Sequence, residues 1–122
     1  MRNVPDPREV IQNTEDICKI SVEQIENAIN QASGQDLNKI RINLHQNLDD
    51  SLHEMLIVHD QHTYVRPHLH EGKSETFHMI SGEMTVVIFD LNGEVIDVIE
   101  MGDYGSGKVF CYRLAPGYYH TV

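Results

Sequence analysis

The sequence predicts an all-β domain, either a sandwich or a barrel, preceded by a single α-helix. Past residue 40, short apolar runs alternate with Gly, Asn, Asp and Pro, and turn signals recur about every 8–12 residues, as in such folds. Before residue 40 the chain is polar and contains one helical pattern. We therefore expect an N-terminal helical segment, residues 1–40, packed on a β domain formed by residues 41–122.

The expected helix covers 21–32. Ser21 is a favourable N-cap, and Gln24 three residues later completes a capping box. The apolar residues that share one face at helical spacing are Val22, Ile25, Ala28, Ile29 and Ala32. Ser33-Gly34 ends the pattern. A single apolar stripe predicts that the helix packs against a larger body.

The expected strands follow from residue 53 onward. They cover 54–59, 62–70, 76–80, 83–89, 94–99 and 108–114. The Asn92-Gly93 pair between two β-rich runs predicts a hairpin with a type I′ turn, since both residues tolerate positive φ. The Gly-rich stretch 102–107 lacks the lysine and the helix start of a phosphate-binding loop, so we expect an ordinary loop there.

Composition excludes several classes of partner. The 122 residues include 9 Lys and Arg against 19 Asp and Glu, a formal net charge of −10. Nucleic acids and anionic membranes require a basic face, so neither is expected as a partner. No apolar run approaches the roughly 18 residues of a membrane span, and the N-terminus lacks the apolar stretch of a secretory signal. Two cysteines outside any metal or disulfide spacing fit reduced thiols in a cytoplasmic protein.

A histidine-rich segment carries the chemistry. On a strand, residues i and i+2 point the same way, so His68 and His70 share one face. The turn that follows returns the chain and brings Glu75 beside them. Two imidazoles and one carboxylate suit a divalent first-row metal, which would also offset the cost of burying the carboxylate. The alternative is a polar surface loop.

A second piece lies further along the chain. Pro116-Gly117 marks a turn that leads into a new strand, and His120 follows a few residues later. His120 could supply a third imidazole from a neighbouring strand. The alternative is a frayed terminal residue.

Strand parity extends the candidate site. Counting back from His68 places Arg66 and Tyr64 on the same face, and an inward arginine needs a carboxylate or an anionic ligand. A structural salt bridge and ligand binding are equal alternatives for Arg66. Tyr118 flanks the site, so the candidate catalytic or orienting residues are Arg66, Tyr64 and Tyr118.

The same parity predicts structural or surface positions, outside the candidate site, for other side chains. His62 lies a strand length away from His68 and is expected at the rim or on the surface. His78 has the opposite parity to Glu75 and is expected to be satisfied or exposed. Phe77 and Met79 share the parity of Glu75 and are expected to pack in the interior.

These motifs resemble those of the cupins. The spacing H-x-H-x4-E-x6-G from His68 to Gly82 resembles the first cupin motif, and Gly117-x-x-His120 resembles the second, with Pro116 adjacent to the glycine instead of two before it. The match is closer still to the WbuC-type cupin-fold metalloproteins of bacterial O-antigen gene clusters. The segments that carry it are 41–45, 64–70, 72–75 and 112–117.

The resemblance implies a double-stranded β-helix, that is, a jelly-roll barrel. It also implies metal ligation by His68, His70, Glu75 and His120, with Zn, Fe, Mn or Ni as the divalent transition metal, and a homodimer. Such proteins continue for several strands past the last histidine, so this chain is expected to be truncated or naturally short.

Three functions remain open at this point. The resemblance favours a metal-binding cupin that acts on or binds a sugar or nucleotide-sugar in surface-polysaccharide (lipopolysaccharide) biosynthesis. The first alternative is a non-haem iron dioxygenase of a small organic acid, which would consume oxygen with iron but not with zinc. The second is a non-catalytic carbohydrate-sensing module, which would be stabilised by its ligand without turnover.

Overall fold

The computed structural model describes residues 7–34 and 38–122; the other parts of the expected helical segment, 1–6 and 35–37, lie outside this description. The chain divides into two compact units, residues 1–63 and 64–122. In chain order the elements are the 3-10 turn η1 (Pro7–Glu9), β1 (Val10–Gln12), α1 (Val22–Gly34), β2 (Lys39–Asn43), β3 (Met55–His59), β4 (Glu75–His78), β5 (Glu83–Phe89), β6 (Val95–Gly102), the 3-10 turn η2 (Tyr104–Ser106), β7 (Cys111–Leu114) and β8 (Tyr119–Thr121).

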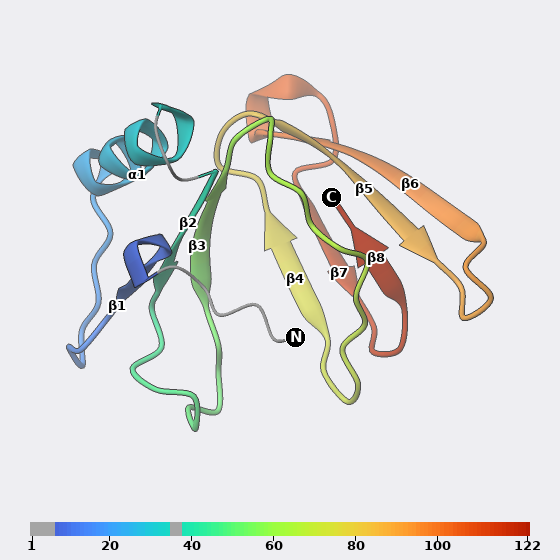
Figure 1. Cartoon of the computed structure of the whole chain (residues 1–122), viewed down its shortest axis with the longest axis horizontal. Coiled ribbons are helices and arrows are strands. Elements are labelled where there is room, and N and C mark those ends of the chain that lie inside the picture. The colour runs from blue at the N-terminus through green and yellow to red at the C-terminus, as the bar shows by residue number, and fades with distance from the viewer. Residues whose placement is uncertain (1–6, 35–37) are drawn as a thin grey trace. The chain divides into compact units, whose positions relative to one another are not determined.

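The first unit combines α1 with a three-stranded sheet in the order β1-β2-β3 (Figure 1). Strand β1 runs parallel to β2, and β2 pairs antiparallel with β3. The helix begins with the expected capping box: the Ser21 amide donates to the Gln24 side chain at 2.8 Å, and the Gln24 amide donates to the Ser21 hydroxyl at 3.2 Å. Ala28 and Ala32 of α1 are buried with Ile40 of β2.

The buried stripe of α1 is narrower than its sequence predicts. Val22 is 71% exposed and Ile29 is 39% exposed, whereas Ala28 and Ala32 are buried. Two alanines four residues apart let the helix backbone approach the sheet closely, which leaves the larger side chains outside the contact. Strands β1 and β2 were absent from the prediction, because each is short and mixes apolar with polar residues.

The second unit contains two antiparallel sheets, β4-β7 and β6-β5-β8 (Figure 1). Its core centres on Val86 and Ile88 of β5 and Met101 of β6, all buried. Phe77 and Met79 pack against this core, as parity with Glu75 predicts. The coarse prediction of a strand-rich chain with one helix is confirmed. Within residues 7–34 and 38–122, however, the strands form three separate sheets and no closed barrel, and the expected helix-on-barrel arrangement of 1–40 and 41–122 stays a prediction.

The β5–β6 hairpin is confirmed, but the predicted type I′ turn is wrong. That turn needs positive φ at both Asn92 and Gly93, and only Gly93 has it, at 82°. The Gly93 amide donates to the Asp90 carbonyl at 3.1 Å, and the Asp90 carboxylate accepts hydrogen bonds from two further backbone amides in the turn. Asp90 thus stabilises a right-handed turn that ends in a left-handed glycine, and a bulge adjusts the register.

The predicted strand 62–70 is also wrong. This segment is irregular apart from an isolated antiparallel bridge between His68 and His120. Period-two alternation therefore does not apply to the residues that precede His68. Elsewhere, η2 forms part of the expected Gly-rich loop, and β7 begins three residues later than predicted. None of the described helices is long and apolar enough to span a membrane.

Candidate metal centre

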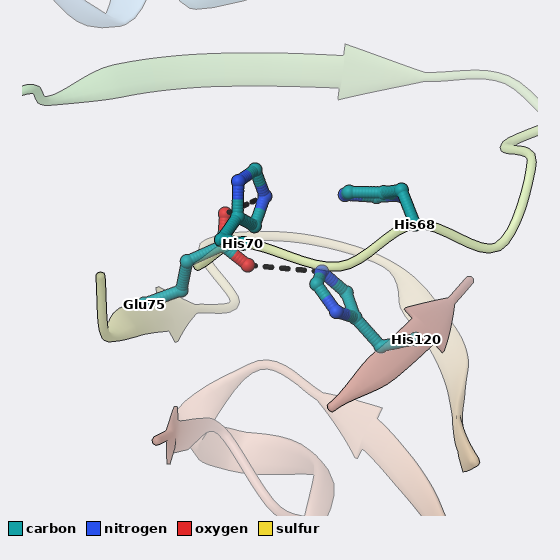
Figure 2. Close-up of side chains that lie close together, drawn as sticks. All are labelled: His68, His70, Glu75 and His120. Carbon is teal, nitrogen blue, oxygen red and sulfur yellow. Dashed lines mark ion pairs between the residues drawn. The ribbon is translucent and has the colours of Figure 1, made fainter. Parts of the chain in front are cut away.

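The second unit brings the four predicted ligands together. One potential ligand atom from each of His68, His70, Glu75 and His120 lies within 4.8 Å of the others, and Figure 2 shows the side chains converging. His68 and His70 belong to the segment before β4, Glu75 is the first residue of β4, and His120 lies in the middle of β8. Metal–nitrogen bonds of about 2.1 Å allow two ligands to be at most about 4.2 Å apart, so only a slight contraction would be needed.

Backbone hydrogen bonds hold this cluster from several sides. The His68 amide donates to the His120 carbonyl at 3.1 Å, and the His120 amide donates to the His68 carbonyl at 2.9 Å. The Gly117 amide donates to the His70 carbonyl at 3.1 Å, from a residue whose φ of 94° favours glycine. Glu75 pairs with Leu114 in the β4–β7 register. Backbone hydrogen bonds therefore hold each of the four candidate ligands, including the two histidines of the irregular segment before β4.

Two of the imidazoles are oriented by backbone carbonyls. The Nδ1 atom of His68 lies 3.0 Å from the Arg66 carbonyl oxygen, and that of His120 lies 3.3 Å from the Tyr118 carbonyl oxygen. A carbonyl only accepts, so each Nδ1 carries the hydrogen and each Nε2 presents its lone pair when the ring is neutral. Hydrogen-bonding the distal ring nitrogen in this way is typical of histidines that ligate metals.

Glu75 lies between two histidines. Its Oε1 is 2.9 Å from Nε2 of His70, and its Oε2 is 2.9 Å from Nε2 of His120 (Figure 2). The His120 side chain is only 2% exposed. Although Oε2 of Glu75 and Nε2 of His120 lie this close, neither atom has a well-directed hydrogen bond to any described residue. Two buried acceptors facing each other need a positive charge between them, either a proton on His120 or a metal ion, so the donor set fits a metal.

The ionisation of this pair follows from the same contacts. Burial acts to raise the pKa of Glu75, but the contact with His120 and the positive potential of the three histidines outweigh it and lower that pKa below 4.5. The contact with Glu75 raises the pKa of His120 above 6.5, against the effect of burial. Metal ligands must be deprotonated, so metal binding would compete with protonation of this pair.

Tyr112 lies near enough to Glu75 to sense its charge, a position that strand parity does not predict. Tyr112 pairs with Phe77 across β4 and β7, and the two rings stack with centroids 5.2 Å apart. Its hydroxyl is buried without a partner among the described residues. Burial and the charge of Glu75 raise the pKa of Tyr112 to about 12, so the phenol stays protonated at neutral pH. The β4–β7 register, which would have revealed Tyr112, cannot be read from sequence spacing.

A small recess adjoins the cluster. His70, Glu75 and His120 line it together with Lys73 and Tyr118. Tyr118 thus lies beside the cluster, and its role there stays a prediction. Lys73 adds a cationic group at the edge, and Leu114 and Ala115 supply an apolar wall.

The inward placement of Arg66 and Tyr64 is wrong. Tyr64 is 79% exposed, and both residues line a different groove together with Tyr119. The physical reason is that 62–67 forms no strand, so its side chains do not alternate in step with His68. His62 and His78 are exposed, as predicted.

The structure thus defines a strand-rich chain with a three-histidine, one-glutamate cluster that could hold a metal ion. A family model described as "Domain of unknown function (DUF6016)" matches residues 20–101, about two thirds of the chain, and the chain belongs to this family. The match includes His68, His70 and Glu75 and ends before His120. No curated protein and no solved structure matches the chain.

Proposed function

We propose that this chain is a metalloprotein of cupin type that holds one divalent transition metal through His68, His70, Glu75 and His120. The observation that carries the proposal is the buried Glu75–His120 pair, whose facing oxygen and nitrogen lie 2.9 Å apart without a directed hydrogen bond. The backbone carbonyls that contact Nδ1 of His68 and of His120 support it, because they leave Nε2 as the ligand atom of each ring. Zn, Fe, Mn and Ni all accept this donor set.

The recess indicates what the site would bind. Four protein ligands leave one or two positions open on a five- or six-coordinate ion, and such an ion polarises oxygen atoms of a bound molecule. Lys73 would attract a negatively charged group, and the Tyr118 hydroxyl could donate a hydrogen bond to it. These groups favour an oxygen-bearing anion; since the recess itself encloses no space for one, the anion would bind at its mouth.

The biological setting remains a separate part of the proposal. The resemblance of 41–45, 64–70, 72–75 and 112–117 to WbuC-type cupins favours a sugar or nucleotide-sugar as the small molecule and surface-polysaccharide synthesis as the process. This resemblance is one of sequence alone, so the setting does not depend on the metal.

Elemental analysis tests the metal. Protein purified without chelator or affinity metal is expected to contain one equivalent of a transition metal, which the His68→Ala/His70→Ala variant loses. The matched control is His62→Ala/His78→Ala, which removes two exposed histidines outside the cluster and should keep its metal. A folded parent that contains no metal and takes up none of the four candidate ions would refute the proposal.

A further inference from the structure

A groove of about 580 Å³ lies on the second unit, apart from the metal recess. Small-molecule sites commonly enclose about 300–1,000 Å³, so the groove is large enough for a ligand. Residues from the segment before His68, from the β5–β6 turn and from β8 line it, chiefly Tyr64, Arg66, Phe89, Asn92 and Tyr119.

The floor of the groove is the outer face of the β5–β8 pair. Phe89 and Tyr119 are cross-strand partners, as are their neighbours Ile88 and His120. Ile88 and His120 are buried at 6% and 2% exposure. Since adjacent residues on a strand point to opposite faces, Phe89 and Tyr119 face away from the core and the metal centre.

The wall of the groove is the irregular segment that was expected to be a strand. The Val65 carbonyl accepts a hydrogen bond from the Thr121 hydroxyl, and the backbone bridge between His68 and His120 fixes the next residues. These contacts hold the segment against β8 and place Tyr64 and Arg66 at the groove.

The chemistry of the groove is aromatic and cationic. It contains three of the eight aromatic residues of the chain, Tyr64, Phe89 and Tyr119. The Arg66 guanidinium has no carboxylate partner within the described ranges, although the formal net charge is −10. A guanidinium binds phosphate through two parallel hydrogen bonds, and aromatic side chains stack on nucleobases.

We propose that this groove binds a nucleoside monophosphate, with its base against the Tyr64, Phe89 and Tyr119 rings and its phosphate on Arg66. Asn92 offers an amide that can donate to and accept from a base edge. The net charge of −10 favours a single nucleotide over a nucleic acid strand, because a strand needs several cations along its backbone. The site is separate from the proposed metal centre and does not require it.

The test uses AMP and UMP as probes on the whole chain in the presence of a chelator. Titrations are followed by amide chemical shifts, and adenosine and inorganic phosphate serve as fragments. We expect saturable shifts at Arg66, Asn92 and Tyr119 with a nucleotide. Each fragment alone should bind at least about tenfold more weakly, because the guanidinium–phosphate contact and base stacking each contribute about a factor of ten or more.

Matched variants assign the effect to the groove. Arg66→Gln should weaken nucleotide binding about tenfold, whereas Arg113→Gln, which removes an equal charge elsewhere on the unit, should not. Tyr64→Leu should weaken it similarly, whereas Tyr104→Leu, at an 83% exposed tyrosine outside the groove, should not. Both groove residues are exposed, so the variants should keep the parent spectrum.

Three results would overturn the proposal: no saturation by AMP or UMP at millimolar concentration, phosphate binding as tightly as the nucleotides, or an unchanged affinity in Arg66→Gln. The His70→Ala variant separates this proposal from the metal site. It should lose metal and keep nucleotide binding, so either proposal can fail alone.

Discussion

Replacing Tyr112 with phenylalanine should stabilise the metal-free protein. The Tyr112 hydroxyl is buried without a partner among the described residues, and leaving such a group unsatisfied costs about 1–3 kcal/mol. The substitution removes the hydroxyl and keeps the ring stacked on Phe77. We therefore expect the free energy of unfolding to rise by about 1–2 kcal/mol.

Urea unfolding followed by tyrosine fluorescence measures this change. All five tyrosines lie within residues 64–122 and the chain has no tryptophan, so the signal reports on the second unit. With a denaturant slope of about 2 kcal/mol per molar urea, the middle of the usual range, the midpoint should rise by roughly 0.5–1 M at an unchanged slope.

The control for this measurement is Tyr118→Phe. The Tyr118 side chain is 40% exposed, so its hydroxyl can bind water, and the change should stay within about 0.5 kcal/mol. A Tyr112→Phe variant that is less stable than the parent by 1 kcal/mol or more would show that the hydroxyl has a partner, and the reasoning would be wrong.

Three further predictions concern other parts of the chain. Glu75→Gln should lower metal affinity by at least the roughly tenfold to hundredfold that loss of outer-shell groups costs; competition with a chelator measures it, and an unchanged affinity would contradict ligation. Burial and the charges of Lys39 and Arg41 on β2 lower the pKa of His59 below 6.5. As the pH falls, His59 is therefore protonated in the unfolded chain before it is protonated in the folded unit. The stability of the first unit should therefore be greatest above about pH 6.5 and fall as the pH drops through that value. The His59→Gln variant should show a weaker dependence of stability on pH when stability is measured by hydrogen exchange. A dependence identical to the parent's would contradict this prediction. Gly117→Ala should lower the unfolding free energy of the second unit by about 1–2 kcal/mol through the positive φ at this position, since no neighbouring atom lies within 4 Å of the added Cβ. The control is Gly105→Ala, at a glycine without positive φ. Equal urea midpoints for the two variants would show that the positive φ causes no strain.

Structural features that depend only on residues close together in the chain could be predicted from the sequence. The capping box needs only Ser21 and Gln24, and both of its hydrogen bonds form. Likewise, His68, His70 and Glu75 lie within eight residues, so one turn suffices to bring them together. The interior positions of Phe77 and Met79 followed from period two because β4 is a strand and the Met79 amide continues its pairing by donating to the Phe110 carbonyl.

The sequence-based predictions fail where a contact with a residue farther along the chain, or one that was not predicted, determines the local structure. The carboxylate of Asp90 selects the turn at Asn92-Gly93 by binding its amides, and no dipeptide rule includes that group. Arg66 was assigned a face by alternation, but its segment is held by single contacts to β8 instead of a continuous ladder. Tyr112 reaches Phe77 through a pairing 35 residues apart in the chain, which spacing alone does not specify.

The order of the ligands along the chain has a consequence for synthesis. His68, His70 and Glu75 leave the ribosome together, but His120 follows 45 residues after Glu75. It takes its place only when β8 pairs with β5 and with the His68 backbone. A nascent chain therefore exposes three residues of the cluster before the fourth exists, and the cluster is complete only once β8 has folded into place.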